Sequence, residues 1–170
     1  MKNGDKDIST KPIVHPVAVG GFNKKTASLY DARRPEYSSE AVDAVLKYMD
    51  LDNLQPLENL SADILELGAG TGKFTKSIHS KIKKSVKYLA TDPMEGFLEQ
   101  AKMNCPNIAT RVCLAEDLPF PDSSIRLVVA AQCFHWFASD TSLQEIHRIL
   151  VPGGKFICLW NNRDVFYSLD

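Results

Sequence analysis

The stretch LELGAGTGKFT, residues 65–75, decides how the rest of the sequence is interpreted. Its glycines, Gly68, Gly70 and Gly72, stand at every second position. Because glycine lacks a Cβ, such a loop adopts left-handed conformations and lets a ligand approach the backbone closely. The apolar run before the loop predicts a buried strand over residues 62–68, and the segment after it predicts a helix over residues 72–84. The question is which ligand the loop holds: a nucleotide phosphate, a dinucleotide or another molecule.

The alternation of strand and helix continues along the chain. Further strands are predicted over residues 86–92, 108–116, 125–133 and 155–161, and further helices over residues 39–50, 94–104 and 141–150. Ser38 or Ser39 is suited to cap the helix at 39–50, and Pro152 with the two glycines after it should end the helix at 141–150. Strands that alternate with helices predict an α/β fold: a Rossmann-like, mostly parallel sheet with helices on both faces, in three αβα layers.

Length and composition indicate a single soluble domain. The chain has 170 residues, of which 44% are hydrophobic and 24% charged, with a net charge of -1. We expect a flexible arm over residues 1–22 and one domain over 23–170. The net charge does not favour nucleic acid or an acidic membrane as a partner. No apolar run is long enough for a membrane span or a secretory signal, so a cytoplasmic location is expected. The four cysteines lie far apart without a CxxC pair, so neither a zinc site nor a disulfide framework is predicted.

Two common glycine-loop motifs do not match. A P-loop requires G-x-x-x-x-G-K-[ST], but Leu67 stands at its first glycine and Phe74 at its hydroxyl position. The dinucleotide motif G-x-G-x-x-G fails at its third glycine, where the chain has Lys73. Glu66 would repel a pyrophosphate but would suit a positively charged group such as an amino-acid ammonium. The loop therefore favours a nucleoside joined to an amino acid.

Asp92 supports a nucleoside ligand. It closes the strand predicted over residues 86–92, 20 residues after Gly72. An acidic residue at the carboxyl end of this strand can accept hydrogen bonds from both ribose hydroxyls. The alternative is that Asp92 caps the helix that starts near Met94. The glycine loop upstream favours the role in ribose binding.

Five segments together resemble a known family. They are YDARRPEY (30–37), LELGAGTGKFT (65–75), ATDPMEGFLEQA (90–101), AEDLPFPDSSIRLVVAAQCFHWF (115–137) and ILVPGGKFICLWNNRD (149–164). In this order they resemble the class I S-adenosylmethionine-dependent methyltransferases, in the methyltransferase type 11 branch. The resemblance covers about residues 28–164, and five segments in register are far more specific than any one of them.

The resemblance implies S-adenosyl-L-methionine as the cofactor and a position for each of its parts. The loop under the methionine part would comprise Glu66, Gly68, Ala69, Gly70 and Gly72. The other implied contacts are Asp92 on the ribose, Pro93 and Met94 on the adenine face, Ala115 and Glu116 at the adenine edge, Gln132 beside the methionine amino group, and Tyr30 and Arg34 over the carboxylate. In many relatives an aspartate stands where this chain has Leu114 and binds the adenine amino group. Here either Glu116 or Asp117 supplies that acceptor, or adenine selectivity is weaker.

The segment FHWF, residues 134–137, follows the strand predicted over 125–133. Its aromatic side chains are suited to line a sulfonium through cation–π attraction, or else Trp136 and Phe137 cover the core. His135 is a candidate general base, or a structural residue. Methyl transfer mainly requires alignment of the reactants and exclusion of water. We expect a small-molecule acceptor; for a carboxylate, the candidate ligands are Arg33, Arg34 and Arg163.

The sequence ends soon after the strand predicted over residues 155–161. The full fold of the resembled family adds another helix and two strands, so we expect a sheet that lacks the last strands and exposes KFICLW as an apolar edge. Such an edge favours self-association. Two functions follow: a methyltransferase, or a catalytically inactive cofactor-binding or interaction module. A nucleotide-dependent oxidoreductase is a distant third, because its glycine spacing fails.

Overall fold

The structure, a computed structural model, describes residues 36–51, 57 and 59–161. The predicted arm over residues 1–22 and the predicted site residues Tyr30 and Arg34 lie outside these ranges. The elements run in the order α3 (Ser39–Met49), β1 (Ala62–Leu67), α4 (Lys73–His79), β2 (Tyr88–Asp92), α5 (Glu95–Asn104), β3 (Ala109–Val112), β4 (Ile125–Ala131), the 3-10 turn η2 (Phe134–Trp136), α6 (Asp140–Ile149) and β5 (Leu150–Leu159).

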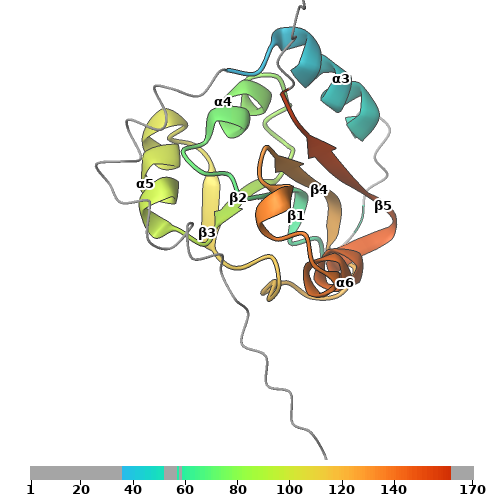
Figure 1. Cartoon of the computed structure of the whole chain (residues 1–170). Helices are drawn as coiled ribbons and strands as arrows, with labels where there is room; N and C mark the ends of the chain where they lie inside the picture. Colours follow the sequence, from blue (N-terminus) through green and yellow to red (C-terminus); the bar gives the residue numbers. More distant parts are fainter. Residues whose placement is uncertain (1–35, 52–56, 58, 162–170) are drawn as a thin grey trace, which may run out of the picture.

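The strands form one five-stranded sheet in the order β3-β2-β1-β4-β5, and all four pairings are parallel (Figure 1). The chain moves from β1 outward to β2 and β3, then crosses back to β4 on the other side of β1. The order of connection therefore reverses between β1 and β4. In open α/β sheets, ligands bind outside the carboxyl ends of the strands at such a switch point.

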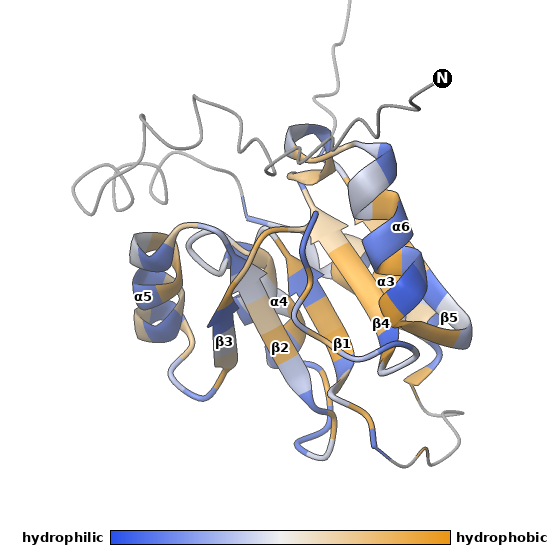
Figure 2. Cartoon of the chain, turned by 90° about the horizontal axis from the view of Figure 1, so that it is seen from below, coloured by the Kyte–Doolittle hydropathy of each residue, from blue (hydrophilic) through white to orange (hydrophobic). Residues whose placement is uncertain are grey.

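Two apolar clusters cover the two faces of the sheet, as the predicted three-layer architecture requires. Helices α3, α4 and α5 pack on one face, where Val45, Phe74 and Leu98 belong to the same core cluster. Helix α6 and the segment before β4 cover the other face through Ile146 and Phe120. The central strands β1 and β4 are coloured mainly hydrophobic in Figure 2. The prediction of an α/β fold with a parallel sheet is confirmed.

Helix α3 matches its predicted range closely, because its start is encoded locally. The Ser38 side chain accepts a hydrogen bond from the Ala41 backbone N–H, which satisfies a helix donor that has no partner within the helix. Val42, Val45 and Met49 form its buried face. Helix α6 starts in the same way, with Ser139 in a capping box.

The helix predicted over residues 72–84 is too long, since α4 ends at His79. The Ser80 hydroxyl donates to the Ser77 carbonyl oxygen at 3.0 Å and so competes with the helical pattern. The Lys81 amine, in turn, bonds to the Ser39 hydroxyl at 2.7 Å and pairs with Asp43, both on α3. The segment after His79 therefore anchors α4 to α3 instead of extending the helix.

The start of the last strand was also wrongly predicted. Strand β5 begins at Leu150, not at Lys155, and the residues that were expected to end a helix form a bulged part of the strand. Ile125 pairs with Leu150, and Leu127 pairs with Lys155. The stretch of β5 between these two pairs is therefore longer than the stretch of β4 opposite it, and the extra residues of β5 form a bulge. A proline within the strand is tolerated because β5 is an edge strand of the described sheet. Among the described residues, β5 is thus an edge strand; the exposure of its apolar residues and self-association through them stay predictions.

Candidate functional site

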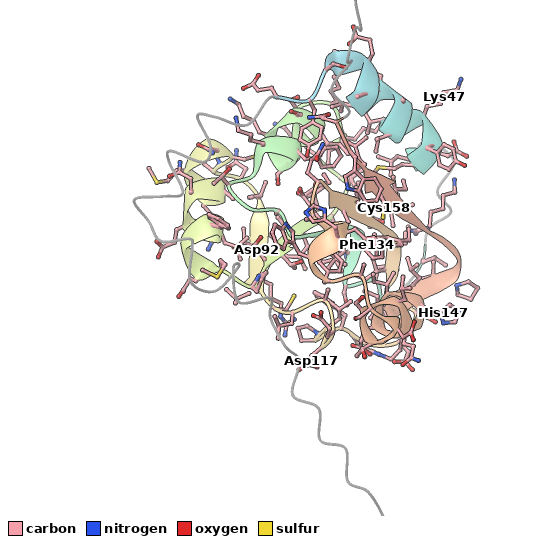
Figure 3. The ribbon with its side chains drawn as sticks, in the orientation of Figure 1. Lys47, Asp92, Asp117, Phe134, His147 and Cys158 are labelled. Carbon is pink, nitrogen blue, oxygen red and sulfur yellow. The ribbon has the colours of Figure 1, made fainter. Side chains whose placement is uncertain are left out.

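Three loops meet at the carboxyl ends of the central strands. Residues Gly68–Gly72, called here the glycine loop, connect β1 to α4; Pro93 and Met94 connect β2 to α5; and residues 132–139 connect β4 to α6. Asp92 on β2 and Phe134 after β4 are labelled in Figure 3. These loops place most of the predicted site residues at one edge of the sheet.

Each glycine of the loop has a positive φ, but the three differ in what surrounds them. The φ values are +62° at Gly68, +57° at Gly70 and +82° at Gly72, a region that other residues rarely adopt. A Cβ on Gly68 would lie 2.8 Å from the Cys133 side chain, and one on Gly72 would lie 2.9 Å from the Ala101 Cβ. A Cβ on Gly70 would meet nothing within 4 Å among the described residues beyond its chain neighbours. Gly68 and Gly72 therefore allow close internal packing, whereas no described residue packs against Gly70.

Asp92 holds the glycine loop through one of its two oxygens. Its Oδ2 accepts a hydrogen bond from the Gly70 N–H at 3.0 Å, and its Oδ1 accepts one from the Met94 N–H at 2.8 Å. Helix α5 has Met94 at its N-cap position, so Asp92 also orders the turn that leads into this helix. A carboxylate oxygen can accept more than one hydrogen bond, so neither contact prevents a ligand hydroxyl from donating to Asp92.

The side chain of Glu66 is buried and bonded within the protein. Only 1% of its surface is exposed, and its Oε2 accepts hydrogen bonds from the Thr75 hydroxyl at 2.5 Å and the Tyr88 hydroxyl at 2.6 Å. Its carboxylate therefore binds groups of the protein in this structure. The predicted role of Glu66 toward the positively charged part of a ligand stays a prediction.

Burial raises the pKa of both carboxyl groups. The pKa of Glu66 is raised to about 7, because desolvation outweighs the hydrogen bonds from Thr75 and Tyr88. The pKa of Asp92 is raised to about 6 by desolvation, against the hydrogen bonds from the Met94 and Gly70 N–H groups. Burial thus raises the pKa of two acids that are both connected to the glycine loop, Glu66 as the residue before Leu67 and Gly68 and Asp92 through its bond to Gly70.

These shifts lead to a prediction about stability. Between the ordinary pKa of each acid and its raised value, the folded chain binds more protons than the unfolded chain. The stabilisation from these two groups is therefore present near pH 4 and is lost as the pH rises through about 6 and about 7. We expect the free energy of unfolding to fall by roughly 2 to 5 kcal/mol between pH 4 and pH 8, as measured by urea denaturation. Glu66→Gln, which cannot ionise, should flatten this slope; an equal slope in the variant would contradict the assignment.

An apolar pocket lies beside Asp92. It is lined by Leu67, Gly68, Thr91, Pro93, Cys113, Leu114, Ala115, Glu116, Trp136 and Phe137. Four of the predicted cofactor-binding residues thus surround one pocket, although they come from three separate segments. These segments are far apart in the sequence but close in space, because the parallel strands β1, β2, β3 and β4 end at the same edge of the sheet.

The turn after β3 determines which carboxylate near Leu114 lies at the pocket. The Asp117 N–H donates to the Leu114 carbonyl oxygen at 3.3 Å, so residues 114–117 form a tight turn. Glu116 lines the pocket and Asp117 does not. Of the two carboxylates predicted as alternatives, Glu116 is the one next to the cavity. Its role as an acceptor for a ligand stays a prediction.

The aromatic residues after β4 divide between core and pocket. The Phe134 ring packs edge-on against Phe137 and Phe156, with centroids 5.5 and 5.4 Å apart. Trp136 and Phe137 line the pocket, and 41% of the Trp136 surface is exposed. The His135 ring lies 4.9 Å from the Trp136 ring and is itself exposed. A catalytic role for His135 stays a prediction.

Gln132 combines two unusual features. Its φ is +60°, although it is not a glycine. Its Nε2 atom is buried and has no hydrogen-bond partner among the described residues, while its backbone N–H donates to the Leu159 carbonyl oxygen at 2.8 Å. Leaving a buried amide group unpaired costs about 1 to 3 kcal/mol, so this group is a candidate to bond a ligand.

Some functional neighbours were not predicted from the sequence. Thr75 and Tyr88 hold Glu66, and the Thr91 hydroxyl donates to the Glu66 carbonyl oxygen at 2.7 Å. The Cys133 thiol donates to the Leu67 carbonyl oxygen at 3.0 Å and packs against Gly68. Thr75 lies within the glycine-rich stretch, and its position there could have indicated a role in the site. Tyr88 has the pattern of an ordinary strand residue and offered none.

Comparison with known proteins agrees with this architecture. The profile of a family described as "Methyltransferase domain" matches residues 65–158. The chain is 39% identical over 135 residues to an uncharacterised methyltransferase-like protein of Schizosaccharomyces pombe, covering 79% of this chain and 49% of that protein. It is 31% identical over 149 residues to a biotin biosynthesis bifunctional protein of Cellvibrio japonicus, covering 81% of this chain and 29% of that protein.

A solved structure shows the same fold. The S-adenosylmethionine-dependent methyltransferase of Aquifex aeolicus superposes with a TM-score of 0.61 at 20% identity, over 86% of this chain and 78% of that one. The fold and the glycine loop are those of the class I S-adenosylmethionine-dependent methyltransferases. Within that class, the chain belongs to the methyltransferase type 11 family. It spans about half the length of the Schizosaccharomyces pombe relative.

Proposed function

We propose that the protein is a methyltransferase that uses S-adenosyl-L-methionine, and that the 170-residue chain contains the cofactor-binding site. The observation that carries this proposal is the position of Asp92. Its carboxylate ends β2 and bonds to the Gly70 N–H, and its chain neighbours Thr91 and Pro93 line the apolar pocket. A nucleoside with an amino-acid extension has its ribose between an apolar base and a polar tail, which corresponds to this order of groups.

The described residues fit each part of the cofactor. The open space at Gly70 leaves room for the methionine part against the loop backbone. Gln132, whose buried Nε2 has no partner among the described residues, would lie beside the methionine amino group, where its amide oxygen can accept a hydrogen bond. The pocket walls formed by Pro93, Leu114 and Phe137 suit the adenine ring, with Glu116 at the rim. Asp92 would accept hydrogen bonds from the ribose hydroxyls.

When bound, the cofactor supplies a methyl group that is already activated by the sulfonium charge. The chain therefore has to bind and orient the reactants and to exclude water. Trp136 and Phe137 present aromatic surface at the pocket, where a cation is attracted to the ring faces. His135, exposed beside Trp136, is the candidate general base for an acceptor that carries a proton.

A small molecule is the acceptor class that we propose. The net charge of -1 gives no field for a nucleic acid. The similar protein of Cellvibrio japonicus is named for biotin biosynthesis, which concerns a small molecule. Arg33, Arg34 and Arg163, the candidate ligands for an acceptor carboxylate, lie outside the described residues. The alternative of an inactive module is not favoured, because the relatives are named methyltransferases.

The deciding experiment is isothermal titration of the 170-residue chain with S-adenosylhomocysteine, the demethylated cofactor. We expect a dissociation constant in the micromolar range, which corresponds to about -8 kcal/mol. Binding would justify a screen of small-molecule acceptors with methyl-labelled cofactor. A folded, monodisperse chain that does not bind would contradict the proposed site.

A further inference from the structure

Three polar side chains meet in the core beneath the glycine loop. Glu66 comes from β1, Thr75 from α4 and Tyr88 from β2. A single oxygen, Oε2 of Glu66, accepts hydrogen bonds from both hydroxyls, at 2.5 Å from Thr75 and 2.6 Å from Tyr88. The exposed fractions are 1% for Glu66, 0% for Thr75 and 6% for Tyr88. The cluster is thus a buried network with almost no contact with solvent.

Stability alone does not account for this cluster. Moving a carboxylate out of water costs several kcal/mol, and apolar residues of similar volume are often at least as stable in such places. The position of the three residues in the chain indicates another role. Glu66 stands two residues before Gly68, Thr75 three residues after Gly72, and Tyr88 four residues before Asp92.

The cluster therefore joins both ends of the glycine loop to the strand that carries Asp92. Further bonds connect the same parts at the level of the loop itself. The Ala69 N–H donates to the Thr91 carbonyl oxygen at 2.9 Å, and the Gly70 N–H donates to Asp92. Two sets of bonds thus fix the distance between the glycine loop and Asp92: those among the side chains of the cluster and those made by backbone N–H groups of the loop. A site fixed in this way loses less freedom when a ligand binds.

We propose that Thr75 and Tyr88 are positioning residues for the cofactor: through the carboxylate of Glu66 they hold the glycine loop at the distance from Asp92 that the cofactor requires. This inference rests on the proposed function, since it takes S-adenosylmethionine and its product to bind on this loop. Neither residue is expected to touch the cofactor.

Two substitutions of Thr75 separate positioning from packing. Thr75→Val keeps the shape of the side chain but removes the hydroxyl, whereas Thr75→Ser keeps the hydroxyl but removes a buried methyl group. If Thr75 only packed, serine would be the more harmful change. We expect instead that Thr75→Val weakens S-adenosylhomocysteine binding by about five- to tenfold, as titration calorimetry measures it, and that Thr75→Ser binds close to the wild type.

Tyr88 provides an independent test with a matched control. Tyr88→Phe removes only the hydroxyl that donates to Glu66, and Tyr48→Phe makes the same change on α3, where the side chain is 72% exposed. We expect Tyr88→Phe to weaken S-adenosylhomocysteine binding by about three- to tenfold and Tyr48→Phe to leave it unchanged. If Thr75→Val fails to fold, as thermal melting would reveal, this pair decides the question.

The outcomes distinguish this inference from the proposed function. Wild-type binding together with wild-type affinity in Thr75→Val or Tyr88→Phe would overturn the positioning role alone. A larger loss in Thr75→Ser than in Thr75→Val would also overturn it, because packing would then be the cause. No binding by the wild-type chain would overturn the proposed function and this inference with it.

Discussion

Replacing Gly70 with alanine should remove most of the cofactor affinity while leaving the chain folded. In the part of the chain that the structure describes, the new methyl group would meet no atom within 4 Å beyond its chain neighbours, so it would project into the space assigned to the methionine part of the cofactor. Overfilling a tightly packed site typically costs about 1 to 3 kcal/mol. We therefore expect S-adenosylhomocysteine to bind about 10- to 100-fold more weakly, as measured by titration calorimetry.

Gly153 provides the matched control for this substitution. It also has a positive φ, +77°, and a Cβ there would likewise meet none of the described residues within 4 Å, but it lies in the bulged part of β5. Both alanine variants carry the strain of a left-handed residue, about 1 to 2 kcal/mol, and should lose similar stability to urea. Only Gly70→Ala should lose affinity. If Gly153→Ala lost as much, backbone strain and not occupation of the site would be the cause.

Replacing Asp92 with alanine should weaken S-adenosylhomocysteine binding by about 10-fold or more. Hydrogen bonds from ribose hydroxyls to a carboxylate contribute about 1.5 to 3 kcal/mol each. The substitution would also leave the N–H groups of Gly70 and Met94 without their acceptor, so the glycine loop would lose its attachment to β2. Unchanged affinity, measured by calorimetry on folded protein, would refute the assignment of the ribose to Asp92.

Asp92→Asn is the more conservative comparison. The amide keeps the size of the side chain and one acceptor oxygen but has no charge and cannot titrate. Because burial raises the pKa of Asp92 to about 6, ribose binding to its charged form should strengthen as the pH rises from 5 to 7. The asparagine variant should bind with intermediate affinity and lack the part of the pH dependence that comes from Asp92. An identical pH profile in both proteins would mean that a group other than Asp92 causes the pH dependence.

The sheet and its connections could be predicted because their signals are local. Short apolar runs bounded by polar segments mark β1, β2 and β4, and a serine at position 38 or 39 marks the start of α3. The position of Asp92 followed from the length of a βαβ unit, which brings the end of the second strand beside the first loop. The predicted family and the α/β fold are confirmed on this basis.

The direction of the Glu66 side chain could not be predicted. Strand β1 is buried on both faces, so alternation along it does not show which face a residue occupies. The partners of Glu66 are nine and 22 residues away in the chain; Thr75 belongs to the glycine-rich stretch, but Tyr88 has no motif of its own. The start of β5 was missed for a similar reason, since proline and glycine usually end an element and are tolerated here only at the edge of a sheet.

The contact between Gly72 and Ala101 has a consequence for how this family can diverge. A Cβ at position 72 would lie 2.9 Å from the Ala101 Cβ and 3.0 Å from its Cα, so the loop and α5 touch at the level of the main chain. A larger residue at position 101 would push the loop away even where all three glycines are retained. Evolutionary covariation between these two distant positions is therefore expected, with position 101 restricted to glycine, alanine or serine in relatives that keep the loop.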